Sequence, residues 1–127
     1  KYGIKMANCE LTKSEKEIMN IIWDAQSPLM IQEILDEVKK RYDKEWRPQT
    51  LSSFLRSLVG KGLLDYHRKN MFSFYWSCMS RKEYASCMQK QLLEEWFEGS
   101  QKEFLSEFVK ACNVSKEIME EVIEEME

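Results

Sequence analysis

Glycine and proline are scarce in this chain of 127 residues, which has four glycines and two prolines. Sheet-rich folds need more turn residues, whereas helices tolerate a composition that is rich in Glu, Lys, Leu and Met. Long apolar runs are also lacking: none exceeds three residues, and a membrane span needs about 18. The first ten residues contain no apolar stretch of the kind found in a secretory signal. We expect a mainly α-helical protein that is neither exported nor embedded in a membrane.

The residues of metal and catalytic sites are scarce as well. The four cysteines are 69, 9 and 25 positions apart, which matches no zinc-ligand spacing, and the one histidine is His67. The chain has no glycine-rich phosphate loop, no H-E-x-x-H motif and no plausible Ser/His/Asp set. We expect no metal, no cofactor and no enzyme activity, with reduced thiols in a cytosolic protein. Cys78 and Cys87 stay open as a redox switch, whereas Cys112 is expected to lie in the core.

Charge is distributed unevenly along the chain, whose net charge is −3. Residues 1–80 carry 13 basic and 10 acidic side chains, a net +3, and residues 81–127 carry 6 and 12, a net −6. Residues 39–69 contain nine basic side chains and three acidic ones. This basic block is either a surface for phosphates or an ordinary solvated face.

The N-terminal part has the pattern of two helices. Thr12 and Glu15 form a T-x-x-E capping box at the start of a helix that ends near Ala25. Ser27 and Pro28 then interrupt the chain. The second helix has apolar residues at i, i+3, i+4 and i+7, namely Ile31, Ile34, Leu35 and Val38.

A third helix is expected to begin at Pro48, because proline is tolerated where first-turn amides are unpaired. Its apolar face has the spacing i, i+3, i+4, i+7 and i+8, at Leu51, Phe54, Leu55, Leu58 and Val59. The other face carries short hydrogen-bonding side chains and one arginine, at Gln49, Thr50, Ser52, Ser53 and Arg56. Such side chains can reach base edges in a DNA groove. We predict that these five read bases; a serine-rich solvent face is the alternative.

Two aromatic-rich runs follow, Leu63 to Arg68 and Met71 to Trp76, with a short joint at Lys69-Asn70. They predict a β-hairpin with a basic tip. A hairpin after a helix-turn-helix is the plan of a winged helix, whose wing grips the DNA backbone. We predict a winged-helix DNA-binding domain over residues 11–79. Its predicted phosphate contacts are Lys39, Lys40, Arg47, Arg68 and Lys69.

The composition changes after Ser80, and three helices are expected at about 81–98, 100–112 and 115–126. They hold more large apolar side chains than so few helices can bury alone. We therefore predict that residues 80–127 form a helical dimerisation domain; packing against the N-terminal half is the alternative. The predicted interface residues are Met88, Leu92, Trp96, Phe104, Phe108 and Val122. Residues 1–10 are expected to be disordered or added to the natural protein; Met6 is a candidate native start, with residues 1–5 as the addition.

Four segments resemble a known family. The first is Leu11-Thr12, Glu15, Ile18-Met19 and Ile22-Trp23, which is similar to L-T-x-x-E-x-x-(V/I)-M-x-x-(L/I)-W. The segment from Ile31 to Leu35 is similar to the family's second helix, and Trp46 to Leu51 is similar to the W-S-P-K-T-I head of its recognition helix. Leu58 to Leu64 resembles L-x-x-K-G-(F/L)-(L/I). On these motifs the chain is identified as a member of the penicillinase-repressor family, which includes beta-lactamase, methicillin-resistance and copper-responsive repressors.

The resemblance implies a bacterial, cytoplasmic, dimeric winged-helix repressor. Family members bind an inverted repeat in double-stranded DNA over a promoter and block transcription. By position, it assigns Gln49, Thr50, Ser52, Ser53 and Arg56 to the groove and Arg68 and Lys69 to the wing. In the antibiotic-responsive branch a sensor-linked protease cleaves an Asn-Phe bond, and the aligned pair here is Glu107-Phe108.

The chain departs from the family pattern at several positions. Arg47 stands where the family usually has Ser, Gln49 where it has Lys, and Ser52 where Arg often follows. We therefore do not expect the operator of the resistance repressors. The C-x-C metal motif of the copper-responsive branch is absent, so copper sensing through it is excluded. A winged-helix module for protein interaction is the competing hypothesis, and the operator, the regulated genes and the inducing signal stay open.

Overall fold

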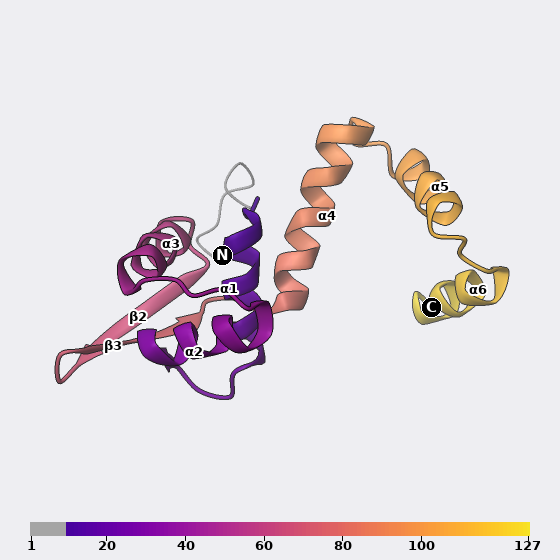
Figure 1. The fold of residues 1–127 in the computed structure, drawn as a ribbon. Coiled ribbons are helices and arrows are strands. Elements are labelled where there is room, and N and C mark those ends of the chain that lie inside the picture. The colour runs from indigo at the N-terminus through magenta and orange to yellow at the C-terminus, as the bar shows by residue number, and fades with distance from the viewer. Residues whose placement is uncertain (1–9) are drawn as a thin grey trace. The chain divides into compact units, whose positions relative to one another are not determined.

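The computed structural model describes residues 10–127, and the expectation for the N-terminal segment therefore falls, except at Glu10, outside the described residues (Figure 1). The elements in chain order are α1 (Lys13–Asp24), β1 (Leu29–Met30), α2 (Ile31–Tyr42), α3 (Pro48–Gly60), β2 (Leu64–Lys69), β3 (Phe72–Ser77), α4 (Arg81–Phe97), α5 (Gln101–Ala111) and α6 (Lys116–Glu125). The predicted mainly helical fold with a small wing is confirmed. The chain forms two compact units, one ending at Met88 and the other covering Gln89–Glu127. Helix α4 therefore begins in the first unit.

The starts of the first three helices follow from local sequence. At α1 the capping box is formed: the Thr12 amide donates to Glu15 Oε1 at 3.0 Å, and the Glu15 amide donates to Thr12 Oγ1 at 3.2 Å. At α2 the Met30 amide donates to Glu33 Oε1 at 2.8 Å. At α3 the first residue is Pro48, and Arg47 at the cap makes no side-chain capping bond. The Arg47 side chain thus remains available for another role.

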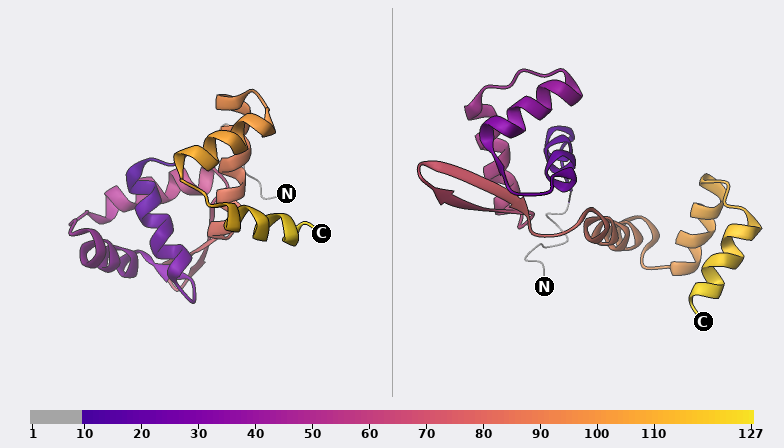
Figure 2. Two further views of the ribbon diagram at one scale, coloured as in Figure 1. Left: turned by 90° about the vertical axis from the view of Figure 1, so that its right-hand side faces the viewer. Right: turned by 90° about the horizontal axis from the view of Figure 1, so that it is seen from below.

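The sheet has three antiparallel strands in the order β1-β3-β2. The sequence predicted the β2–β3 hairpin but missed β1, because a two-residue strand leaves no periodic pattern. The hairpin also lies one residue later than predicted: Lys69 pairs with Phe72, so the turn residues are Asn70 and Met71. The β2–β3 hairpin extends beyond the helices of its unit as a ribbon (Figures 1 and 2).

One hydrophobic core joins the three helices and the base of the wing. Its buried members come from α1, α2, α3, the start of β2 and the segments just before β2 and after β3, and they are Ile18, Met19, Ile21, Ile22, Ile34, Val38, Leu51, Leu55, Leu58, Leu63, Leu64 and Met79. Tyr84 and Cys87, on the first turns of α4, pack against this core. The apolar face that spacing predicted for α3 is therefore the face turned inward, which leaves its polar face toward solvent.

The C-terminal unit differs from the first unit in how little of its helices is buried. Ser100 caps α5 and Ser115 caps α6, each accepting a hydrogen bond from a first-turn amide. Phe97 and Phe104 stack with ring centroids 5.2 Å apart. No residue of α5 or α6, all of which the structure describes, is buried. The placement of Cys112 in the core was wrong: it caps the C-terminus of α5 and is exposed, because no side chain among the described residues covers this end of the helix.

Candidate nucleic-acid interface

The outer face of α3 presents the five predicted base-reading residues. Gln49, Thr50, Ser53 and Arg56 are exposed and Ser52 is half-buried. Ser53 Oγ donates to the Gln49 carbonyl at 3.2 Å, one turn back on the same helix. This internal bond occupies the Ser53 proton, while Gln49, Thr50 and Arg56 remain exposed to solvent. This face of α3 thus carries mostly short polar side chains and one cation, Arg56.

A groove of about 350 Å³ lies between α3 and the wing. It is lined from α3 by Ser52, Arg56 and Val59, from the wing by Tyr66, Arg68, Ser73 and Tyr75, and from α2 by Ile31. Tyr66 and Tyr75 stack on the same wing face, with centroids 5.5 Å apart. Two guanidiniums from different elements therefore share a groove with several hydroxyls. That donor set matches a phosphate oxyanion.

The pKa of Tyr75 reports on this groove. Burial raises the pKa of the Tyr75 phenol and the neighbouring Tyr66 raises it further, while Arg56 and Arg68 act in the opposite direction. Both arginines line the groove with Tyr75, although 12 positions of sequence separate them. The groove brings together a predicted base reader, Arg56, and a predicted phosphate contact, Arg68.

Ion pairing divides the nine cations of the basic block into two groups. Four are paired: Lys39 with Glu45 at 2.7 Å and Asp43 at 3.4 Å, Arg41 with Asp24 at 2.7 Å, Lys44 with Glu17 at 2.8 Å, and Lys61 with Glu15 at 2.6 Å. Within residues 10–127 the other five have no carboxylate within 4.0 Å, and they are Lys40, Arg47, Arg56, Arg68 and Lys69. All five were predicted to contact DNA. Of the predicted phosphate contacts, Lys39 alone is engaged by acidic neighbours.

The segment ahead of α3 is held in place by contacts that the sequence did not reveal. Asp43 ends α2 in the left-handed region with φ 55°. Lys44 reaches back to Glu17 on α1, and its ammonium lies 5.9 Å from the Trp46 ring centroid. Trp46 in turn packs on Phe54, in the second turn of α3, with ring centroids 5.2 Å apart. These contacts set the direction in which α3 leaves the turn.

The C-terminal end of α3 is held by the capping carboxylate of α1. Glu15 Oε2 accepts from Ser57 Oγ at 2.6 Å, and Glu15 Oε1 lies 2.6 Å from Lys61 Nζ. Sequence reasoning found Glu15 as a cap and missed this second role, since no local pattern links it to residues more than 40 positions away. The same carboxylate that starts α1 thus positions the end of α3.

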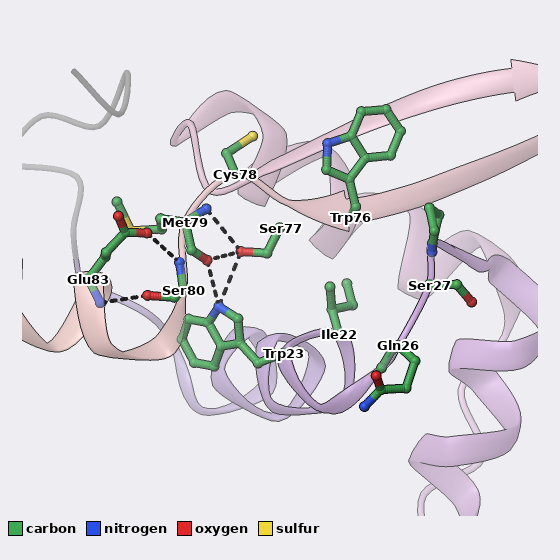
Figure 3. Close-up of a pocket in the computed structure, with 12 residues that line it drawn as sticks. Ile22, Trp23, Gln26, Ser27, Trp76, Ser77, Cys78, Met79, Ser80 and Glu83 are labelled. Carbon is green, nitrogen blue, oxygen red and sulfur yellow. Dashed lines mark hydrogen bonds between the residues drawn. The ribbon is translucent and has the colours of Figure 1, made fainter.

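A hollow of about 510 Å³ marks the junction between the wing and α4 (Figure 3). Trp23 Nε1 donates to Ser77 Oγ at 3.1 Å and to the Met79 carbonyl at 3.0 Å. Arg81 lies over the Trp23 ring at 5.2 Å from its centroid and also pairs with Asp24 at 3.0 Å. The wing base and the first turn of α4 are therefore both tied to the end of α1.

The predicted interface residues occupy α4, α5 and α6. Leu92, Trp96, Phe108 and Val122 are exposed, with 75% of Trp96 accessible, and Met88 and Phe104 are half-buried. Leu105, Ile118, Ile123 and Met126 are also exposed apolar side chains of α5 and α6 or the residue after it, and prediction had not included them in the interface. Glu107-Phe108 lies inside α5, in regular helix.

No group of three or more His, Cys, Asp and Glu side chains within residues 10–127 is placed to hold a metal ion. No helix of this same range has both the length and the apolar character for a membrane span.

Comparisons with known proteins agree with this geometry. The sequence model of the family described as penicillinase repressor matches residues 11–127. The methicillin resistance regulatory protein MecI of Staphylococcus aureus strain N315 is 25% identical over 113 residues, which cover 89% of each chain. The penicillinase repressor of Bacillus licheniformis is 23% identical over 118 residues, covering 93% of this chain and 90% of the relative. The solution structure of the DNA-binding domain of the repressor BlaI aligns with a TM-score of 0.53 and 26% identity, over 64% of this chain and 93% of that one.

Proposed function

This chain belongs to the penicillinase repressor family, and we propose that it is a dimeric transcriptional repressor of an inverted-repeat operator in double-stranded DNA. Each protomer places α3 in a major groove, where Gln49, Thr50, Ser52, Ser53 and Arg56 read base edges. The wing and the helix flanks hold the sugar–phosphate backbone. No catalytic residue takes part, and the bacterial cytoplasm is the compartment where such DNA lies.

One observation carries the proposal: five cations of the basic block are unpaired among the described residues, and two of them, Arg56 and Arg68, line the groove between α3 and the wing. Lys40, Arg47, Arg56, Arg68 and Lys69 keep their charge free of acidic neighbours among the described residues, whereas Lys39, Arg41, Lys44 and Lys61 are each paired with a carboxylate. Unpaired cations are available to displace the counterions of DNA. The release of these counterions is the main source of the electrostatic affinity of a protein for DNA. Lys39 can join them only by leaving Glu45.

Dimerisation is supported by the exposed apolar side chains of α4, α5 and α6. In water these side chains would stay uncovered in a lone chain, and covering them with a second copy removes apolar area from solvent. A two-fold dimer sets two half-sites about one helical turn, or a multiple, apart. A protein bound over a promoter in this way would exclude the polymerase sterically.

Induction by a sensor-linked protease is a further part of the proposal, with Glu107-Phe108 as the bond in question. This bond is in the interior of α5, so α5 must unwind locally before an extended peptide can enter a protease site. Release of α6 from the dimerisation region would then weaken the dimer and its hold on the operator.

The deciding experiment measures binding of the full chain to duplexes flanking its own gene, with random DNA as the control. Fluorescence anisotropy over roughly 50–200 mM salt gives the affinity and its salt dependence. Tight binding to one fragment, with two protomers per site and a steep salt slope, is the expected result. The absence of any salt-dependent binding would reject the proposal in favour of a winged-helix module for protein interaction.

A further inference from the structure

The tip of the wing has an unusual backbone. Asn70 and Met71 both have positive φ, at 51° and 72°. Tight hairpin turns of this kind favour Asn followed by Gly, because a side chain in the left-handed region is sterically strained. At Met71 the side chain is 86% exposed, so packing within the chain does little to offset that strain. Backbone strain that packing does not offset is typical of residues that contact a ligand.

The surroundings of Met71 define the partner it fits. Arg68 and Lys69 come directly before the turn, and neither is paired with a carboxylate in the described part of the chain. Phe72, directly after Met71, is 59% exposed. The tip therefore presents exposed apolar side chains next to two unpaired cations of β2. A surface with anionic rims and a floor that accepts apolar groups is the complement of this shape, and the DNA minor groove is such a surface.

We propose that Met71 inserts into the minor groove next to the major groove occupied by α3, and that it favours A·T over G·C pairs there. This inference rests on the proposed function. Guanine carries an amino group that projects from the minor-groove floor, which A·T pairs lack. The Met71 thioether is only a weak acceptor, so it would desolvate that amino group without replacing its hydrogen bonds. Arg68 and Lys69 would hold the flanking phosphates, and narrow A·T-rich grooves attract such cations most strongly.

The test uses the full chain and duplexes selected from a random library for tight binding. Hydroxyl-radical footprints of the wild type and of Met71→Gly locate the base pairs that the tip protects. Those pairs are then made A·T, G·C or inosine·C, since inosine·C resembles G·C in the major groove but lacks the minor-groove amino group. We expect A·T and inosine·C duplexes to bind roughly 5- to 20-fold more tightly than G·C duplexes, as for one unfavourable base pair. In Met71→Gly the ratio should fall to near one.

Two control variants separate the side chain from the turn. Asn70→Gly relieves the other left-handed residue and keeps Met71, so it should keep the preference, as should Met71→Leu, which stays apolar. The proposal is overturned if inosine·C behaves like G·C, if Met71→Gly keeps the wild-type ratio, or if the two footprints are identical. In each of those cases tight binding to the selected duplex persists, so the proposed function survives. Loss of selective DNA binding by the wild type would instead reject the proposed function and this inference with it.

Discussion

Lys61 Nζ lies 2.6 Å from Glu15 Oε1, an ion pair that joins the first turn of α1 to the residue after α3. The Glu15 side chain is only 3% exposed and its other oxygen accepts from Ser57. Three elements of the DNA-binding unit, the α1 cap, the last turn of α3 and the turn into the wing, therefore depend on one carboxylate.

We expect Glu15→Gln to lower the free energy of unfolding by roughly 2–4 kcal/mol, because it leaves the Lys61 ammonium without its counter-charge in a mostly buried place. Urea denaturation of the full chain, followed by tryptophan fluorescence, measures this. Glu45→Gln is the matched control: Glu45 is exposed, its pair with Lys39 is screened by water, and little change is expected. Equal losses in the two variants would show that the buried pair has no special weight.

The same variant should also change the acid sensitivity of the protein. Burial alone would raise the pKa of the Glu15 carboxyl, but hydrogen bonds from Lys61, Ser57 and the Thr12 amide outweigh it and hold the pKa below its ordinary value of 4.5. A depressed folded-state pKa stabilises the fold above the unfolded value, and this contribution is lost as pH falls through the folded value. The gap in unfolding free energy between wild type and Glu15→Gln should therefore be full at pH 7 and shrink below about pH 4.5. A gap independent of pH would exclude this role of the ionised carboxylate.

The division between paired and unpaired cations predicts different salt dependences. Lys40→Ala removes an unpaired charge and should reduce the log–log salt slope of DNA binding by about 0.9 for each phosphate lost. Lys44→Ala removes a charge that is paired with Glu17 and should leave the slope close to that of the wild type. Anisotropy titrations at several salt concentrations compare the two. The reverse order of effects would mean that the ion pairs open on DNA.

Arg56→Ala tests base reading at the end of α3. If Arg56 contacts a base edge, the substitution costs about 1–3 kcal/mol of operator affinity and relaxes preference at one base position. Arg68→Ala, on the wing side of the same groove, should weaken binding to the operator and to random DNA alike. Selection of binding sites with each variant reads out the preference. Uniform weakening by Arg56→Ala would make it a second phosphate contact in the groove, beside Arg68.

Trp96→Ala tests dimerisation without touching the winged helix. Trp96 is 75% exposed in the single chain, and a buried tryptophan at an interface centre is worth about 2 kcal/mol or more. For Trp96→Ala we expect the dissociation constant of the dimer, measured by sedimentation equilibrium, to rise by at least roughly 30-fold. Lys90→Ala, an exposed charge of the same helix, serves as the control. An unchanged dissociation constant in Trp96→Ala would place the interface elsewhere.

Local pattern predicted the helices well because their determinants are local. The Thr12–Glu15 box and Pro48 at the start of α3 each act within one turn of the residue that carries the signal. The position of the hairpin turn was predicted less accurately. The expected turn at Lys69-Asn70 lies at Asn70-Met71, because a methionine in the left-handed region gives no sequence signal.

Sequence by itself determined which faces of α1, α2 and α3 are apolar, the basic character of the block before and within the wing, and which short polar side chains occupy the opposite face of α3. These follow from the 3.6-residue period and from composition, which need no knowledge of neighbours. Tertiary structure alone decided which of those charges are free. Glu15, Glu17 and Asp24 on α1 reach cations of α2, the turns and α4, and so withdraw Arg41, Lys44 and Lys61 from the surface available to DNA. Pairing of this kind depends on distances of a few ångströms between side chains 17 to 46 positions apart, and periodicity carries no information about such distances.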